Sequence, residues 1–335
     1  MHELSIRDTN IIKGVALICL LFHHLFFVEN GLFYDYYVCN HGVVNELGKV
    51  CKVCVALFVF LSGYGLAKST KEDISYGKFF LHRLSKLMPT FWLIWLLFVP
   101  LGVFVFGRTF EVVYVDCIIP KFFLDIFGLI NVFGIYGYNA TWWFMSCIIM
   151  LYALFPFLLI ITRNRRNLIV LFLVSLGFLF LPIPYFSSIK YYVIIFIVGI
   201  IFAEKKVLSK ISNLGYPFGI WVILLIVFVA LRCVLPYKPL IDIFVCLSII
   251  MLYNSLESRN IIFRWLHFLG VHSMNIFLFH TFIYAYYFEA IIYSPKNPIL
   301  IFMLLLCICL IISMGIEKIK SIIGIQKLNN YLSKK

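Results

Sequence analysis

Long apolar runs recur along almost the whole chain of 335 residues, and they constrain its fold more than any other feature. A run of about 17–22 apolar residues can cross a bilayer as an α-helix, because each residue advances the helix by about 1.5 Å. The sequence therefore predicts an all-α integral membrane protein with about ten transmembrane helices, in which residues 1–335 form a single membrane domain. The expected helices are 11–28, 50–67, 87–107, 141–161, 168–186, 190–204, 216–235, 240–256, 273–293 and 298–317.

The composition supports this class of fold and argues against an ordinary soluble domain. Hydrophobic residues make up 63% of the chain and charged residues only 13%, whereas soluble domains carry about 25% charged residues. Residues 117–135 are also apolar, but Pro120, Lys121 and Asp125 interrupt them. We therefore expect an interfacial or re-entrant segment there, in place of an eleventh helix.

The distribution of basic residues predicts which side of the membrane each loop occupies. The N-terminus, the loops 68–86, 162–167, 204–215 and 257–272, and the C-terminus hold 20 of the 28 lysines and arginines. Acidic residues divide almost evenly, so the whole net charge of +13 falls on this side. Cytoplasmic loops carry such an excess of lysine and arginine. Both termini are therefore expected in the cytoplasm, and the basic charge indicates contact with membrane lipids and not with nucleic acid.

Two long connections, 29–49 and 108–140, then lie on the outer side and contain glycine, asparagine, tyrosine and aspartate. Long loops on a rigid scaffold often carry recognition residues. We expect these two segments to contribute to the recognition of a molecule outside the cell.

The ten cysteines do not indicate a metal site. Most of them stand singly inside apolar runs, where cysteine behaves as a small hydrophobic residue. Cys51 and Cys54 form a CxxC pair, but a second pair or a nearby histidine that would complete a zinc site is absent from the sequence around them. We predict no metal, and a disulfide among Cys39, Cys51 and Cys54 stays open as an alternative to simple packing.

A histidine pair, His23-His24, lies inside the first apolar run, where an ionisable side chain indicates a functional site. Lys13 precedes His24 by eleven residues, which is about three helical turns, so the two side chains share one stripe about 16 Å apart. His23 is rotated about 80° from that stripe. Two interpretations stay open: the histidines take part in catalysis, or they form structural hydrogen bonds to a neighbouring helix.

A basic segment precedes the third apolar run. Arg83 and Lys86 are three residues apart and share a face if this stretch is helical. Pro89 suits the first turn of the following helix, whose free N–H groups attract anions. The segment is therefore either a phosphate-binding site or an anchor for lipid headgroups.

Five short motifs, considered together, resemble those of a known family. They are Lys13-Gly14-Val15-Ala16 with His24, Phe60-Leu61-Ser62-Gly63-Tyr64, Arg83-x-x-Lys86-x-x-Pro89, Trp143-Phe144 with Tyr152 and Pro156, and Ser273-Met274-Asn275-Ile276-Phe277-Leu278-Phe279-His280. In order and spacing they are similar to the motifs of membrane acyltransferase family 3, whose members are mostly O-acyltransferases of bacterial surface glycans. The resemblance covers essentially the whole chain.

The chain departs from the family pattern at several of these positions. Lys13 stands where many members have arginine, which replaces a two-pronged contact with a point charge. Lys86 likewise replaces the second arginine of the basic motif, and Phe277 stands at a tyrosine position. Ile148 occupies the place of a glutamate that many members carry.

The resemblance implies a membrane-bound O-acetyltransferase of the bacterial plasma membrane. It would move an acetyl group from cytoplasmic acetyl-CoA to a hydroxyl of an extracytoplasmic or lipid-linked surface polysaccharide. Lys13, Arg83 and Lys86 would bind the phosphates of the donor, and His24 would act as general base or hold the acyl group transiently.

His280 is expected about 10 Å from the cytoplasmic end of its helix. It would orient the thioester or stabilise the oxyanion, although a structural hydrogen bond is an equal alternative. A carboxylate partner for His24 is not identifiable from the sequence.

The rival hypothesis is a transporter or flippase of a lipid-linked sugar. It accounts equally well for ten helices, intramembrane polar groups and outer loops. It does not account for the aligned Lys13 and His24 together with the basic Arg83 and Lys86 segment.

Overall fold

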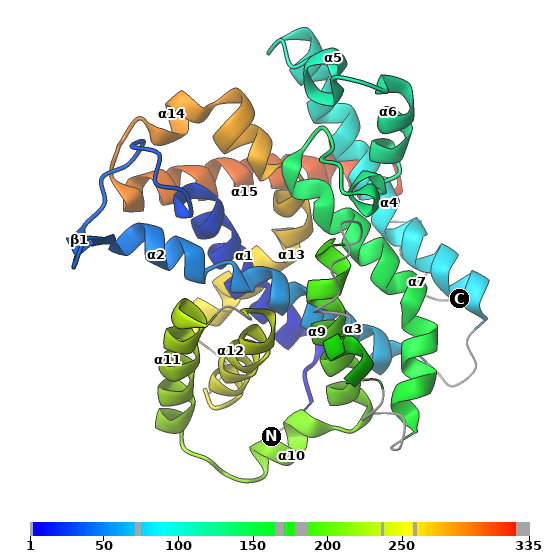
Figure 1. Cartoon of the computed structure of the whole chain (residues 1–335), viewed down its shortest axis with the longest axis vertical. Helices are drawn as coiled ribbons and strands as arrows, with labels where there is room; N and C mark the ends of the chain where they lie inside the picture. The colour runs from blue at the N-terminus through cyan, green and yellow to red at the C-terminus, as the bar shows by residue number, and fades with distance from the viewer. Residues whose placement is uncertain are drawn as a thin grey trace.

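The computed structural model describes residues 3–70, 75–164, 171, 173–177, 187–235, 238–256 and 260–325. Within them the chain is almost entirely helical, with one two-stranded hairpin (Figure 1). The helices of the first half are α1 (Ile6–Phe26), α2 (Val43–Val50), α3 (Val53–Ser69), α4 (Tyr76–Phe104), α5 (Phe110–Tyr114), α6 (Ile118–Ile126) and α7 (Trp143–Arg163). The others are α9 (Ser187–Glu204), α10 (Val207–Ser212), α11 (Phe218–Val234), α12 (Lys238–Asn254), α13 (Ile261–Thr281), α14 (Glu289–Tyr293) and α15 (Pro298–Ile322).

Shorter elements complete the described part. The hairpin strands β1 (Tyr37–Val38) and β2 (His41–Gly42) pair antiparallel, and short 3₁₀ segments cover η1 (Ile130–Phe133) and η2 (Ala140–Trp142). A π-helical segment, η3 (Phe282–Tyr287), follows α13 directly.

Six helical stretches of the described residues are long and apolar enough to cross a membrane. They are Ile6–Phe26, Val43–Ser69, Tyr76–Phe104, Ala140–Arg163, Ile261–Tyr287 and Pro298–Ile322, and two shorter apolar helices, Phe218–Val234 and Pro239–Asn254, accompany them. The protein is therefore an all-helical, multi-pass membrane protein. The expected count of ten helices stays a prediction, and most of the expected helix 168–186 lies outside the described residues.

Hydrogen bonds between connecting segments place these segments at two ends of the helical bundle. At one end the backbone N–H of Ser209 donates to Glu3 Oε1 at 3.2 Å, and Lys68 donates to the carbonyl of Leu4 at 2.5 Å. At the other end the backbone N–H of Tyr34 donates to the carbonyl of Lys296 at 2.9 Å. In Figure 1 the N-terminus and α10 lie at the bottom, and α5, α6 and α14 lie toward the top. This grouping agrees with the charge-based topology, while the assignment of the cytoplasmic side stays a prediction.

Two helices begin well before the positions that apolar runs predict. The helix expected at 87–107 is α4, which begins at Tyr76. Pro89 therefore lies in its interior, and the expectation that Pro89 opens the helix was wrong. The helix expected at 273–293 corresponds to α13, which begins at Ile261. The Asn260 side chain caps it and accepts from the N–H of Phe263 at 3.2 Å. Both helices carry charged or polar residues in their first turns, which an apolar-run criterion misses.

The segment 117–135 forms no spanning helix. It folds into the nine-residue α6 and the 3₁₀ segment η1, and both are too short to cross a bilayer. Asp125 is fully buried and accepts from the Tyr114 hydroxyl at 2.7 Å and from the N–H of Tyr138 at 2.5 Å. This carboxylate therefore fixes the fold of the long 108–140 connection.

Candidate active site

The site is built on the contact between α1 and α13, where two glycines let the helices approach closely. A Cβ atom at Gly14 would lie 2.0 Å from the carbonyl oxygen of Leu266, and one at Gly270 would lie 1.8 Å from that of Asn10. Only a residue without a side chain fits such a distance. Ten residues after Gly14 and ten after Gly270, the chain places His24 and His280.

His24 and His280 meet at that level. Their ring centroids are 4.8 Å apart, and the Tyr284 ring lies 5.9 Å from His280 and 6.1 Å from His24. The glycine contacts come first and the histidine contact comes later along both helices, so α1 and α13 run parallel. The expectation that His280 lies about 10 Å from the start of its helix was wrong. The helix begins at Ile261 and ends at Thr281, so His280 is the last residue but one of α13.

The two nitrogens of His280 have different environments. Nδ1 lies 3.0 Å from the carbonyl oxygens of Ile276 and Phe277 on the same helix, so it carries the proton and donates it there. Nε2 is then an acceptor, and it is buried with no hydrogen-bond partner among the described residues. Since buried polar atoms normally have a partner, this nitrogen is available to a proton on His24 or on a substrate.

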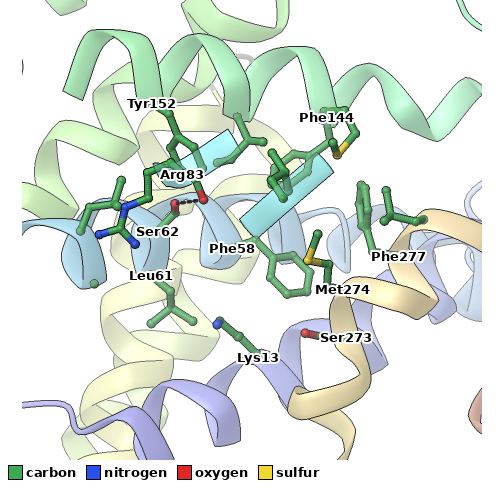
Figure 2. Close-up of a pocket in the computed structure, with 16 residues that line it drawn as sticks. Lys13, Phe58, Leu61, Ser62, Arg83, Phe144, Tyr152, Ser273, Met274 and Phe277 are labelled. Atoms are coloured by element: carbon green, nitrogen blue, oxygen red, sulfur yellow. Dashed lines mark hydrogen bonds between the residues drawn. The ribbon is translucent and has the colours of Figure 1, made fainter. Parts of the chain in front are cut away.

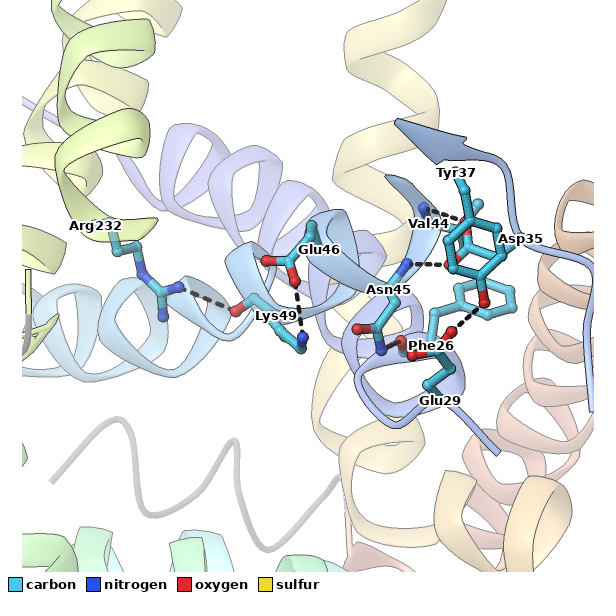
Figure 3. A network of polar contacts seen from close by, with 9 residues as sticks. All are labelled: Phe26, Glu29, Asp35, Tyr37, Val44, Asn45, Glu46, Lys49 and Arg232. Atoms are coloured by element: carbon cyan, nitrogen blue, oxygen red, sulfur yellow. Dashed lines mark hydrogen bonds and ion pairs between the residues drawn. The ribbon is translucent and has the colours of Figure 1, made fainter. Parts of the chain in front are cut away.

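The segment 29–49 holds the end of α1 in place (Figure 3). Asp35 accepts from the N–H groups of Val44 and Asn45, at 2.8 and 2.9 Å, and so caps the start of α2. The Asn45 side chain then donates to the carbonyl of Phe26 at 2.8 Å, and His23 Nδ1 lies 2.8 Å from the carbonyl of Gly48. His23 is therefore engaged with α2, while His24 faces α13.

The π-helical segment after His280 has an identifiable cause. Trp142 Nε1 donates to the carbonyl of Leu278 at 2.8 Å, and the Asn139 side chain donates to the same oxygen at 3.3 Å. These outside donors replace a bond of the regular α-helix, and the chain continues with the wider turn of Phe282–Tyr287. Tyr284 lies within this turn, where its ring stacks on His280.

A cavity of about 530 Å³, here called the His24 cavity, opens on the two histidines of α1. Aromatic and hydroxyl side chains dominate its wall, and Lys52 contributes the only cation among its lining residues. No carboxylate belongs to this lining. The lining residues include Leu20, His23, His24, Lys52, Asn131, Tyr136, Thr141, Trp143, Tyr191, Tyr192, Phe277, Thr281, Tyr284 and Tyr286.

A second cavity of about 290 Å³, here called the Lys13 cavity, lies nearer the end of the bundle that holds the N-terminus. Figure 2 shows Lys13 and Arg83 approaching it from α1 and α4, with Phe277 at the far side from Arg83. In its wall the Ser62 hydroxyl donates to the Tyr152 hydroxyl oxygen at 3.4 Å. Its remaining wall is mostly apolar, so Lys13 and Arg83 are the two cations among its lining residues.

The guanidinium of Arg83 has spare hydrogen-bonding capacity. Nη2 donates to the Ser69 hydroxyl at 3.1 Å, and the group lies 5.4 Å from the centre of the Phe79 ring. Its Nε is buried without a hydrogen-bond partner among the described residues. An anion in the cavity would supply the missing acceptor.

Comparison with known proteins gives one match, to the family model described as an acyltransferase domain, which covers residues 6–318. The chain belongs to this acyltransferase family. Because the match spans essentially the whole chain, the two cavities lie within the acyltransferase domain itself. No curated protein and no solved structure was found to match the chain.

The acyltransferase brings together most of the site residues that the sequence singled out. Lys13 and Arg83 line one cavity, and His24 contacts His280 beside the other. Lys86 lies on α4 but is not among the residues that line the Lys13 cavity. The roles of all five stay predictions.

Other residues of the family motifs have structural partners. The Asn275 side chain donates to Glu317 Oε1 at 2.8 Å and to the Ser313 hydroxyl at 3.1 Å, so it joins α13 to α15. The Tyr64 hydroxyl donates to Glu3 Oε2 at 2.5 Å. These side chains lie outside both cavities, and we assign them to packing.

The cysteines show no bonded pair. All ten are free, and among the described residues no group of three or more histidine, cysteine or acidic side chains is placed to hold a metal ion. Cys54 is buried, and Cys51 is half-buried at the turn before α3. The alternative of a disulfide among Cys39, Cys51 and Cys54 is therefore not seen in this structure.

Sequence reasoning missed the residues that shape the cavities. Lys52, Tyr284 and Tyr286 belong to no motif, and Phe277 was noted only as a departure from the family pattern. An available signal was the spacing of Phe277, Thr281 and Tyr284, which places all three on one face of a helix.

Proposed function

We propose that this acyltransferase moves an acetyl group from acetyl-CoA on the cytoplasmic side to a hydroxyl of a surface polysaccharide or lipid-linked glycan on the outer side. The observation that carries the proposal is the order of groups along the bundle. Two cations line the Lys13 cavity, and two histidines in contact adjoin the His24 cavity. A donor held from one side and an acceptor held from the other would meet between them.

The Lys13 cavity suits the arm of a CoA thioester. Lys13 and Arg83 supply positive charge, and Arg83 has an unused donor for a phosphate oxygen. Apolar side chains such as Phe58, Phe144 and Leu87 form the rest of the wall, as a slender uncharged arm requires. Lys13 precedes His24 by about 16 Å along α1, a distance that an extended pantetheine arm is about long enough to span.

The His24 cavity suits a glycan. Its tyrosines and Trp143 present flat apolar faces to a sugar ring, while their polar atoms, with Thr141 and Asn131, offer hydrogen bonds to hydroxyls. Its volume of about 530 Å³ lies in the range of small-molecule sites, which is enough for one or two sugar units.

The transfer itself needs one base and one proton path. His24 takes the proton of the acceptor hydroxyl as its oxygen attacks the thioester carbonyl. The carbon–sulfur bond then breaks, the new ester forms, and the proton passes from His24 to the leaving CoA sulfur. In this step an N–H of His24 donates to the unpartnered Nε2 of His280. This hydrogen bond orients the His24 ring and stabilises the positive charge that develops on it.

The proposal is tested with purified protein in nanodiscs, [¹⁴C]acetyl-CoA and the lipid-linked glycan fraction of the host membrane. We expect label in the glycan, a matching acetyl mass increment, and loss of both in His24→Ala. Asn275→Ser is the matched control, because Asn275 lies on α13 outside both cavities. Binding of the glycan fraction without binding of acetyl-CoA or acetyl transfer would instead favour the flippase hypothesis.

A further inference from the structure

One side chain, that of Phe277, separates the two cavities. Among the described residues it is the single one that lines both the Lys13 cavity and the His24 cavity. It is 7% exposed. On α13, Ser273 and Met274 before it and Leu278 directly after it line the Lys13 cavity, whereas Thr281 at the end of α13 and Tyr284 on η3 line the His24 cavity.

Two further phenylalanines stand at the same level on other helices. The ring centroid of Phe144 on α7 lies 4.9 Å from that of Phe277. The ring centroid of Phe58 on α3 lies 6.4 Å from that of Phe277, in an edge-to-face arrangement. Both line the Lys13 cavity only. Three helices thus contribute one ring each to an aromatic partition, here the Phe277 partition, made of Phe58, Phe144 and Phe277.

The partition lies directly beside the candidate catalytic pair. The Phe277 ring centroid is 6.2 Å from that of His280, and its carbonyl is one of the two acceptors of the His280 Nδ1 proton. An acyl group that enters from the Lys13 cavity therefore meets Phe277 before it reaches the histidines.

We propose that Phe277 is the specificity-determining residue for the acyl group: its ring closes the Lys13 cavity, limits the length of the acyl chain, and keeps water in the His24 cavity from the thioester. The inference rests on the proposed acetyl-CoA function. A short acyl group fits against the ring, and a longer one needs the space that the ring occupies. The reaction that the ring prevents is hydrolysis, in which water attacks the thioester carbonyl, the carbon–sulfur bond breaks, and a free acid and the CoA thiol result.

The expected effects follow from the size of the side chain. Hydrophobic pockets distinguish substrates that differ by one methylene by about 10-fold or more, so removal of a ring should relax the preference for acetyl over butyryl by at least that factor. Phe277→Ala and Phe277→Leu should both show the change, and Phe277→Tyr, which keeps the ring, should not. Phe277→Ala should also hydrolyse acetyl-CoA faster than wild type when no acceptor is present.

The experiment measures transfer from acetyl-, propionyl- and butyryl-CoA to the glycan fraction, together with the release of free CoA without acceptor. Phe279→Leu is the matched control, because Phe279 is fully buried on the same helix, stacks on Phe98 at 5.3 Å, and lines neither cavity. The butyryl-to-acetyl ratio does not depend on how much protein folds.

The possible outcomes distinguish failure of the proposed function from failure of the role proposed for Phe277. If wild-type protein transfers no acyl group from any CoA thioester, the proposed function fails. If it transfers acetyl and the ratio in Phe277→Leu and Phe277→Ala equals that of wild type, the assignment of Phe277 is wrong. An equal shift in Phe279→Leu would likewise overturn it, since the change would then reflect general loosening of α13.

Discussion

The close approach of α1 and α13 gives the sharpest test of how this fold positions its site. A Cβ atom at Gly270 would lie 1.8 Å from the carbonyl oxygen of Asn10, whereas ordinary contacts are 3.4–4 Å. In Gly270→Ala the two helices must therefore separate by about 1.5 Å, because the atoms in the way belong to the backbone. Overpacking of this kind costs about 1–3 kcal/mol of stability.

The same displacement should reach the histidines. His280 follows Gly270 by ten residues on a continuous helix, so it lies about 15 Å away along α13. A shift of about 1.5 Å would lengthen the ring separation between His24 and His280 well beyond its 4.8 Å and weaken their contact. Since a misplacement of about 1 Å can reduce a rate about 100-fold, we expect Gly270→Ala to lower acyl transfer by that order.

The assay measures transfer from [¹⁴C]acetyl-CoA in nanodiscs, normalised to monodisperse protein, together with thermal unfolding. Gly315→Ala is the matched control, because Gly315 lies on α15 with nothing within 4 Å of the added Cβ; it should keep activity and gain up to about 1 kcal/mol. Gly14→Ala should resemble Gly270→Ala, and the double variant should lose less than the sum, since one separation relieves both clashes. Wild-type activity and stability in Gly270→Ala would refute the reasoning.

Three further predictions concern the two cavities and the 108–140 connection. His24→Ala should abolish transfer in protein that still inserts, while His23→Ala should retain more activity because its ring is held by α2; equal rates in radiolabel assays would contradict this difference. Arg83→Ala should weaken acetyl-CoA binding by about 10- to 100-fold in nanodisc titrations, the loss expected for a hydrogen bond to a charged group, and should flatten its salt dependence. Lys86→Ala should change binding less, because Lys86 does not line the cavity, and an equal loss would place both cations at the donor. Burial raises the pKa of Asp125 to about 6 from 3.8, so the folded protein keeps a proton that the unfolded chain has lost between these values, and stability falls as pH rises through them. Asp125→Asn should remove this fall of ~3 kcal/mol, read from thermal unfolding between about pH 4 and about pH 7, and a slope that persists would exclude Asp125 as its source.

Apolar periodicity predicted the class of fold, because a long run of apolar residues has few alternatives to a membrane helix. It failed at the starts of α4 and α13, where Lys78, Arg83 and Arg264 lie on helices that continue beyond the apolar run. Charged residues are tolerated there because long basic side chains reach the membrane surface while the backbone stays helical.

The candidate site was predictable as separate residues and not as a constellation. His24 and His280 each attract notice as intramembrane histidines, but their contact depends on the register of α1 against α13, which Gly14 and Gly270 set. The spacing of Phe277, Thr281 and Tyr284 indicates a shared helix face, but the position of Phe277 between two cavities could not be predicted, for a similar reason. A phenylalanine in an apolar helix is ordinary, and only the positions of two cavities show that this one divides them.

The placement of these groups on α13 bears on how an acyl group would cross the protein. Phe277 and His280 are three residues apart, so they are separated by about 4.5 Å along the helix. A thioester that stops at the ring is therefore within one helical turn of His280, whose ring lies 4.8 Å from that of the base, His24, and the acyl group alone has to pass the partition. This distance favours a local rotation of Phe277 over an alternating-access movement of whole helices. Trapping the protein with a crosslink between α1 and α15 should then leave acetyl transfer intact, whereas a flippase would stop.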